Sequence, residues 1–352
     1  MSDRQVWRVD RAGSLDRLKL QTEALPALKA GQAGVAVKAV GLNFADVFAC
    51  LGLYSATPPG SFVPGLEFAG VVEQVGDDVT NLSPGDLVVG LTRFGAYTTH
   101  INLDVRYLRR LPPGWTAAEG AAYPVQAITA WYAIRDLGAC KTNAAVLVHS
   151  AAGGVGLNAL AILSALGARV VATVGSRDKV PFLVAHTGLR ADQIVVRDRR
   201  QFGAQLDEAL RASGMAGFDL VLDGVAGPFF APAYQRLCPA GRLVIFGAAD
   251  LMPKGTRPDW LRLAPRYLRR PRVDPIQMIT DNKSVMGFNL IWLWDRADRL
   301  GPVYDELALM MPRPPYVGMR FPFAGAPEAM RFLQGGASVG KVVLEIEQET
   351  GC

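Results

Sequence analysis

The middle of the chain alternates apolar runs with segments of helical character. AVLVHS (145–150) is rich in β-branched residues, meets the glycine cluster AAGGVG (151–156) and is followed by the helix-like LNALAILSALGA (157–168). The later apolar runs are ARVVATVG (168–175), ADQIVV (191–196), FDLVLDGVAG (218–227) and GRLVIFGA (241–248). Apolar runs that alternate with helices predict a parallel sheet covered by helices on both faces.

The glycine cluster marks a candidate nucleotide site. It stands where a strand ends and a helix begins, so its backbone can approach a pyrophosphate while the free N–H groups of the helix N-terminus bind it. Alanine takes the place of the first glycine of G-x-G-x-x-G, and the flanking strands make the match specific where the glycine string alone is weak. The expected cofactor contacts are Ala151, Gly153, Gly154, Val155 and Gly156. The pattern predicts a nicotinamide cofactor and hydride chemistry.

The end of the second strand bears on the choice between NAD and NADP. NAD sites usually carry an acidic residue there for the ribose 2′-hydroxyl, whereas NADP sites carry residues that accept the 2′-phosphate. This chain has Gly175 and Ser176 at that point, and Arg177 and Lys179 follow. The pattern favours NADPH. Asp178 counts against it, and the alternative is that the two basic residues are ordinary surface residues at a helix start.

The first 120 residues differ from the middle. Short strand-like pieces, GVAVKAVGLN, FAGVVEQVG, DLVVGL and GAYTTHINL, are separated by Pro-Gly and Gly-Asp turns. This pattern predicts a compact β-rich domain before the nucleotide fold. Residues 111–134 then lead into a helix that runs toward Cys140. The expected fold class is α/β, with a Rossmann parallel sheet and a second, β-rich domain.

Composition and charge fit an enzyme of the reducing cytoplasm. Half of the 352 residues are hydrophobic, but no apolar run approaches a membrane span, and MSDRQVWRVDRAG lacks the apolar core of a signal peptide. The net charge of +5 is scattered and does not indicate nucleic acid binding. The four cysteines lie far apart and form neither a metal pattern nor a disulfide framework.

Eight motifs in order carry a specific resemblance that covers nearly the whole chain. They are GLNFADVFACLGLY (41–54), PGLEFAGVVEQVG (64–76), SPGDLVVG (83–90), AITAWYAI (127–134), VLVHSAAGGVG (146–156), FDLVLDGVAG, GRLVIFGAA and GKVVLEI (340–346). With them the chain resembles the zinc-independent quinone oxidoreductase branch of the medium-chain dehydrogenase/reductase superfamily. The resemblance implies a GroES-like catalytic domain formed by residues 1–123 and 291–352, a Rossmann NADPH-binding domain at 124–290, and usually a homodimer.

The zinc-using relatives carry a cysteine three residues before an aspartate, and later a Gly-His-Glu triplet. Here Asn43 precedes Asp46, and the later triplet is Gly65-Leu66-Glu67. Neither Asn43 nor Leu66 is a plausible zinc ligand, and the four-cysteine structural lobe is absent from the sequence. We therefore expect no bound metal. Of the three histidines, His149 lies inside an apolar strand and is expected to be a satisfied core residue rather than a catalyst.

The resemblance implies NADPH-dependent reduction of quinones or α,β-unsaturated carbonyls, acceptors that delocalise charge without a metal. Asn43 and Tyr54 match positions that line the nicotinamide cleft. Tyr54 is the candidate for hydrogen bonding or protonating the acceptor oxygen, with a packing role as the alternative, and Asn43 is expected to position the cofactor. The remaining matched cofactor positions are Thr129, Arg197, Phe246-Gly247-Ala248 and Phe288-Asn289-Leu290.

The segment 251–283 departs from the plain family pattern. Between 254 and 272 it carries seven basic residues and one acid, which gives seven minus one, or +6. Trp260, Leu263, Tyr267 and Leu268 recur at helical spacing, but three prolines interrupt any long helix. With the SVMGFNL that follows, the segment resembles the VAT-1-like subgroup. A basic amphipathic segment can contact an anionic membrane or partner; the plainer interpretation is a solvated loop whose aromatics pack beside the substrate cleft.

Two other functions stay open at this point. One is a VAT-1-like cofactor-binding protein that associates with a membrane or a partner and has little turnover. The other is an enoyl-thioester reductase, which requires a channel for a pantetheine arm.

Overall fold

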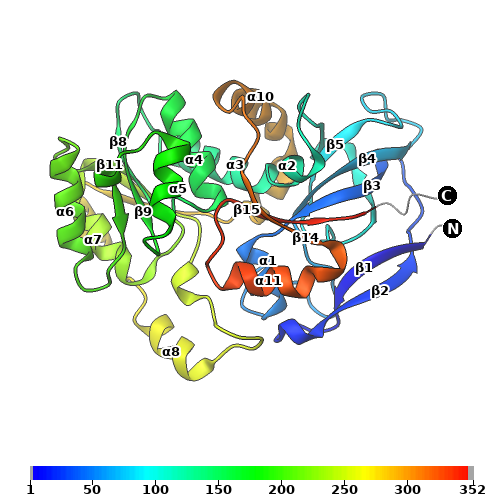
Figure 1. The fold of residues 1–352 in the computed structure, drawn as a ribbon, viewed down its shortest axis with the longest axis horizontal. Helices are drawn as coiled ribbons and strands as arrows, with labels where there is room; N and C mark the ends of the chain where they lie inside the picture. The colour runs from blue at the N-terminus through cyan, green and yellow to red at the C-terminus, as the bar shows by residue number, and fades with distance from the viewer. Residues whose placement is uncertain (1–2, 348–352) are drawn as a thin grey trace.

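A six-stranded parallel sheet forms one half of the molecule in the computed structural model, which describes residues 3–347 (Figure 1). Its strand order is β10-β9-β8-β11-β12-β13, and every pair is parallel. Counted along the chain this is the order 3-2-1-4-5-6 of the Rossmann fold. The strands are β8 (Ala145–Val148), β9 (Arg169–Val174), β10 (Ile194–Val196), β11 (Phe218–Asp223), β12 (Leu237–Ile245) and β13 (Ser284–Gly287).

Successive residues of β8 face opposite sides of this sheet, so the strand contributes side chains to two hydrophobic cores. Val146 and Val148 belong to one core and Leu147 to the other. The first core is covered by α3 (Pro124–Trp131), α4 (Gly154–Ala165), α5 (Lys179–Thr187) and α10 (Leu300–Met310), and the second by α6 (Phe202–Ala212) and α7 (Phe230–Gln235). The expected parallel sheet with helices on both faces is confirmed.

A seven-stranded, mostly antiparallel sheet forms the other half. Its order is β14-β15-β3-β4-β5-β7, with β6 paired to β3, and a separate hairpin joins β1 to β2. The strands and helices of this half, the hairpin included, are β1 (Asp3–Val9), β2 (Leu18–Ala24), β3 (Gln32–Gly41), α1 (Phe44–Cys50), β4 (Glu67–Val75), β5 (Leu87–Leu91), β6 (His100–Asp104), β7 (Leu108–Arg110), α2 (Ala117–Ala121), β14 (Val317–Pro322), α11 (Ala326–Gln334) and β15 (Lys341–Glu345). Because β14 and β15 come from the end of the chain, the polypeptide returns to this sheet after the Rossmann strands.

Two local expectations need refinement. Of the run 95–103, only the part from His100 onward is strand, because Gly95 has φ 103° and Tyr97 donates its N–H to Pro64 O across a turn. The second refinement concerns α10, which lies within the segment 291–352 that was expected to belong to the catalytic domain. Its residues Val303 and Leu307 pack in the same core as Val148, on the Rossmann side. The division of the chain into domains at 123/124 and 290/291 stays a prediction.

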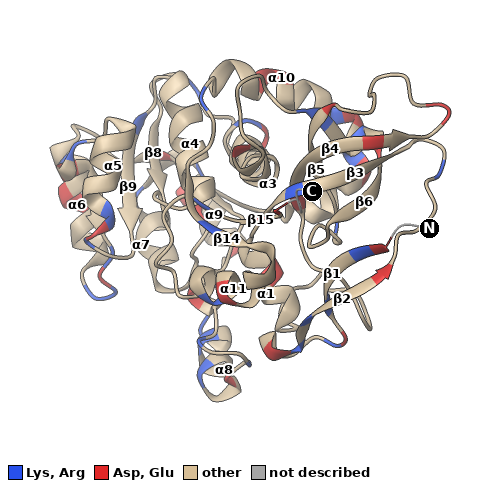
Figure 2. Ribbon diagram, turned by 45° about the vertical axis from the view of Figure 1, so that its right-hand side comes forward, with Lys and Arg blue, Asp and Glu red and all other residues tan. Residues whose placement is uncertain are grey.

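The segment 251–283 forms two short helices, α8 (Trp260–Leu268) and α9 (Pro275–Asp281). The helical spacing of its apolar residues is therefore confirmed, and Figure 2 shows α8 standing away from both sheets with the arginines along it in blue. The plainer interpretation is wrong about the aromatics, since Trp260 and Tyr267 are 64% and 55% exposed. No helix within residues 3–347 is long and apolar enough to cross a membrane.

Candidate active site

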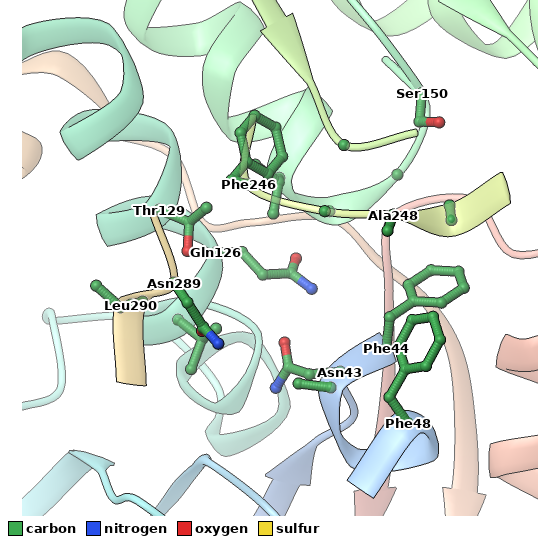
Figure 3. A pocket seen from close by; sticks show the side chains of 18 of the residues that line it. Asn43, Phe44, Phe48, Gln126, Thr129, Ser150, Phe246, Ala248, Asn289 and Leu290 are labelled. Carbon is green, nitrogen blue, oxygen red and sulfur yellow. The ribbon is translucent and has the colours of Figure 1, made fainter. Parts of the chain in front are cut away.

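A cleft of about 1080 Å³ contains most of the expected site residues. Its wall is built by the β3–α1 connection, α3, the glycine turn, the end of β12 and the start of β15. Figure 3 shows the amides of Asn43 and Gln126 in the middle of this cavity. Around them lie Thr129, Asn289 and Leu290 on one side, and Phe44 and Phe48 on the other.

The glycine turn lies between the end of β8 and the start of α4. Gly153, Gly154, Val155 and Gly156 line the cleft, whereas Ala151 is fully buried beneath the turn. A Cβ on Gly156 would lie 2.6 Å from the Cα of Ala151, so the helix approaches the turn closely enough to require glycine there. The first N–H groups of α4 and its dipole then face the cavity, which is the arrangement that binds a pyrophosphate.

Two basic side chains line the cleft near the end of β9. Arg197 donates to Thr173 Oγ1 over 2.7 Å, and Lys179 donates to Ser338 O over 2.8 Å. Burial lowers the pKa of Arg197 to about 10 and also lowers the pKa of Lys179. Gly175 also lines the cavity. Ser176 and Arg177 lie outside the lining, and Arg177 is exposed, whereas Arg197, another expected cofactor position, lies on the cavity wall.

Tyr54 contacts the segment that was expected to close over the nicotinamide. Its hydroxyl donates to Asn289 Oδ1 over 2.8 Å. Burial raises the pKa of Tyr54 to about 12, so the phenol keeps its proton at physiological pH and can donate a hydrogen bond. The structure brings this pair into one cleft with the other expected lining residues: Thr129, Phe246, Gly247, Ala248, Phe288 and Leu290.

Asn43 lies in a buried polar network. Its Nδ2 donates to Glu67 Oε1 over 2.8 Å, and its Oδ1 accepts from Lys341 Nζ over 2.9 Å. Lys341 also forms a buried ion pair with Glu67, and both side chains are almost completely buried. The backbone N–H of Asn43 donates to Asp46 Oδ2 over 2.8 Å. Asn43 is thus held from both ends of its amide while it remains on the cavity wall.

Three further polar residues in or next to the cleft were not predicted from the sequence: Gln126, Glu67 and Lys341. Gln126 is 8% exposed and lines the cleft, and its Oε1 has no hydrogen-bond partner within residues 3–347. An unpartnered buried acceptor is unfavourable by about 1–3 kcal/mol, so a ligand that brings a donor would satisfy it. A polar residue within the apolar helix motif PVQAITAW was the available signal.

His149 differs from its expectation as a satisfied core residue. Its Nδ1 lies 3.2 Å from Thr173 Oγ1, but Nε2 is buried without a partner in the described part of the chain. Burial lowers the pKa of His149 to about 4, so the imidazole is neutral at physiological pH. It also lines the cleft beside Arg197, and a ligand there would meet an uncharged ring.

The donor set does not fit zinc. Leu66 is apolar, and Glu67 is already occupied by Lys341 and by the N–H of Val125, which donates to Oε2 over 2.8 Å. Within residues 3–347 no three His, Cys, Asp or Glu side chains gather as metal ligands. A lysine ammonium beside the carboxylate would repel a cation. This donor set therefore gives no support to a metal-dependent step.

A Rossmann sheet and a β-rich sheet that share a cleft with a glycine turn are the architecture of a medium-chain oxidoreductase. Family models agree: residues 29–113 match the alcohol dehydrogenase GroES-like domain, and residues 154–290 match the zinc-binding dehydrogenase model. The chain belongs to the zinc-independent quinone oxidoreductase branch of the medium-chain dehydrogenase/reductase superfamily, and it is similar to the VAT-1 homologues.

Three relatives illustrate this placement. The synaptic vesicle membrane protein VAT-1 homolog of Danio rerio is 32% identical over 95% of this chain and 68% of its own length. The quinone oxidoreductase of Thermus thermophilus, solved alone and with NADPH, is 29% identical, with a TM-score of 0.74 over 97% of this chain and 99% of that one. The CurK enoyl reductase is 26% identical, with a TM-score of 0.82 over 98% of this chain and 99% of that one.

Proposed function

We propose that this protein reduces quinones or α,β-unsaturated carbonyls by hydride transfer from NADPH. The observation that carries the proposal is a single cleft in which the glycine turn, Arg197 and Lys179 accompany Tyr54. The first three features suit a phosphorylated dinucleotide, and a neutral phenol suits an oxygen on which negative charge develops. The Thermus thermophilus relative, solved with NADPH, supports the same choice of cofactor.

The roles of the residues follow from their positions. The start of α4 binds the pyrophosphate, and Arg197 and Lys179 hold the 2′-phosphate through charge-assisted hydrogen bonds. Thr129 and the turn Phe246-Gly247-Ala248 enclose the nicotinamide, which supplies the hydride when bound. The single O–H of Tyr54 is donated to Asn289 Oδ1 before the acceptor binds, and it turns from Asn289 to the acceptor oxygen when the acceptor is in place.

The cavity wall also contains aromatic surface that suits a flat apolar acceptor. Tyr107 and Trp294 stack with ring centroids 3.7 Å apart, and Tyr132 meets Phe288 edge to face at 4.9 Å. All four residues line the cleft. Planar conjugated rings gain both apolar burial and offset stacking from such a wall. A quinone or an enone matches it better than a strongly polar sugar or amino acid.

An acceptor screen with NADPH tests the proposal. We expect rapid NADPH oxidation with 2-methyl-1,4-naphthoquinone or with 2-cyclohexen-1-one, and slower oxidation of NADH. Crotonyl-coenzyme A should be added to the same screen, because the CurK enoyl reductase shares the fold. Turnover of the thioester alone would replace the proposal with enoyl-thioester reduction. Absence of turnover with every acceptor would contradict both.

A second candidate function, association with an anionic membrane, is favoured by the surface of α8 and α9. Leu261, Ile276 and Ile279 are 90%, 70% and 76% exposed, and exposed arginines stand in and after α8 at positions 262, 266, 269, 270 and 272. Exposed apolar side chains within a basic patch are typical of helices that lie in a lipid interface. Flotation with phosphatidylserine vesicles, with phosphatidylcholine vesicles as the control, tests this. Leu261→Ser together with Ile279→Ser should abolish binding, whereas unchanged binding would exclude this surface.

We also propose a homodimer. β13 is the last strand of the six-stranded sheet, and within residues 3–347 its outer edge has no partner strand. An open edge is a site for pairing with a second chain. Sedimentation at micromolar protein should give twice the mass of the chain, and a monomer at all concentrations would contradict this.

A further inference from the structure

A continuous set of hydrogen bonds joins the glycine turn to the inner wall of the cleft. The N–H of Gly340 donates to Ala152 O over 2.8 Å, so the start of β15 lies directly against the turn. The next residue, Lys341, extends its side chain to Asn43 and Glu67. The backbone of β15 is thus fixed by the turn, and its first side chain is fixed by the catalytic sheet.

The same set continues into α3. Glu67 Oε2 accepts the N–H of Val125 over 2.8 Å, in the first turn of that helix. α3 also carries Gln126 and Thr129, both of which line the cavity. One carboxylate therefore links Asn43 on one wall to the helix that forms the opposite wall. The chain segments involved are far apart in sequence, since Asn43 and Lys341 are 298 residues from one another.

Stability alone is a poor reason for this arrangement. Lys341 is 1% exposed and Glu67 is fully buried. Buried ion pairs are often no more stabilising than apolar side chains of similar volume, because desolvation opposes the attraction between the charges. The ion pair instead fixes the orientation of the Asn43 amide, because Asn43 donates to Glu67 and accepts from Lys341. Its amide therefore cannot rotate freely at the cavity wall.

We infer that Lys341 is a positioning residue for hydride transfer. Together with Glu67 it fixes the amide of Asn43 and the first turn of α3 relative to the glycine turn. The inference rests on the proposed function, because it concerns the placement of the nicotinamide against the acceptor. We assign Lys341 no contact with the nicotinamide or the acceptor, and its effect is transmitted through Asn43.

A double-mutant cycle tests the inference. The four proteins are wild type, Lys341→Met, Asn43→Ala and the double variant, with Lys19→Met as the control at an exposed lysine. Each is measured for thermal unfolding, for NADPH binding by fluorescence, and for single-turnover reduction of 2-methyl-1,4-naphthoquinone. Lys341→Met should slow hydride transfer about 10- to 100-fold, as expected when reacting groups shift by about an ångström, with NADPH affinity changed less than about threefold. In the Asn43→Ala background it should change the rate little further.

The inference is contradicted if the two substitutions lower the rate of hydride transfer independently of each other. If the rate losses of Lys341→Met and Asn43→Ala multiply, or if the rate falls only as the folded fraction falls, Lys341 has a structural role alone. Should Lys341→Met fail to fold, Lys341→Arg keeps the charge beside Glu67 and supplies the same cycle, with partial loss of rate expected.

The failure of the proposed function can be told apart from the failure of this inference. If wild type binds NADPH but reduces no acceptor, the cycle is followed by the emission maximum of bound NADPH, which reports the surroundings of the nicotinamide. A shift toward free NADPH in Lys341→Met but not in Lys19→Met then supports the inference, and no shift overturns it. If wild type does not bind NADPH, both proposals are overturned.

Discussion

The hydroxyl of Tyr54 donates a hydrogen bond to Oδ1 of Asn289 over 2.8 Å, across 235 residues of sequence. The bond joins the loop after α1 to the segment that follows β13, so it joins the two sheets over the cleft. Burial raises the pKa of Tyr54 to about 12, and the bond to Asn289 opposes this only in part. Tyr54 is therefore a neutral donor whose one proton is held by Asn289, and it must exchange this bond for one to the acceptor oxygen.

The first prediction concerns Tyr54→Phe. If the phenol stabilises charge on the acceptor oxygen, turnover should fall about 10- to 1000-fold while NADPH affinity changes little. The loss should be larger for an enone than for a quinone, because a quinone delocalises the charge of the hydride step. Stopped-flow rates with both acceptors measure this. Asn289→Ala keeps the phenol but removes its hydrogen-bond partner, so it should lower turnover less than Tyr54→Phe does. Unchanged rates in Tyr54→Phe would make it a packing residue.

The second prediction concerns cofactor choice. Lys179 and Arg197 line the cleft, whereas Arg177 does not. Lys179→Met and Arg197→Met should each weaken NADPH by about 1–3 kcal/mol, as expected for a lost hydrogen bond to a charged group, and should leave NADH nearly unchanged. Arg177→Met is the matched control and should have little effect. Equal losses for both cofactors in titration calorimetry would contradict a 2′-phosphate site.

The local parts of the fold were predictable because short-range chemistry determines them. In the sequence, β8 is a run of β-branched residues, the glycine turn is a run of small residues, and α4 is a stretch of helical character. The exposed helix α8 was likewise visible as helical spacing of its apolar residues, although it continues through Pro265. Its solvent exposure was not predictable, because an amphipathic pattern does not show whether another element covers the apolar side.

The rest of the site depends on contacts between distant segments. Nothing near Lys341 in sequence indicates that it pairs with Glu67, which lies 274 residues away. Arg197 was matched to a cofactor position only through the resemblance, and its closeness to the loop of Arg177 has a similar origin. The loop after β9 turns Arg177 outward, while Arg197 at the end of the neighbouring strand β10 faces inward. Only the order of the strands in the sheet brings that second residue to the cavity.

The third prediction separates two glycines of the turn. A Cβ on Gly156 would meet the Cα of Ala151 at 2.6 Å, whereas one on Gly153 would meet only Ser150 O at 3.2 Å. Gly156→Ala should therefore lower the free energy of unfolding by about 1–3 kcal/mol through overpacking. Gly153→Val should keep most of the stability and abolish NADPH binding, because its side chain enters the phosphate site.

Urea unfolding and NADPH titration of the same samples check this prediction. Gly325→Ala is the control, since a Cβ there meets neighbours at ordinary distances of 3.6 Å and more. Normal NADPH binding by Gly153→Val would show that the turn does not hold the phosphates.

The fourth prediction concerns metal. With Asn43, Leu66 and the Lys341–Glu67 pair at the inner cleft, purified protein should contain no stoichiometric zinc, and chelators should leave activity intact. Elemental analysis that finds about one zinc per chain would contradict the assignment of this donor set.

The last prediction concerns Asp46, which is 1% exposed. Burial raises the pKa of its carboxyl group to about 7, although Asn43 N–H donates to Oδ2. In the unfolded chain the carboxyl has a pKa of about 3.9. Between about pH 4 and pH 7 the folded protein thus keeps a proton that the unfolded chain has released. Folding stability must fall as pH rises through this window, because the folded state binds more protons.

Asp46→Asn removes that ionisation and keeps an oxygen that accepts from Asn43. The stability of Asp46→Asn relative to wild type should therefore increase by about 1–4 kcal/mol between pH 4.5 and pH 8, at about 1.4 kcal/mol for each unit of pKa shift. Urea unfolding at four pH values measures this difference. Glu67, Lys341, Tyr97 and Cys50 surround the carboxyl in both proteins, so the difference reports the ionisation of Asp46 together with its coupling to these groups. Asp10→Asn at the surface is the control and should follow wild type. Parallel pH curves for wild type and Asp46→Asn would show that Asp46 is ionised in the folded protein throughout this range.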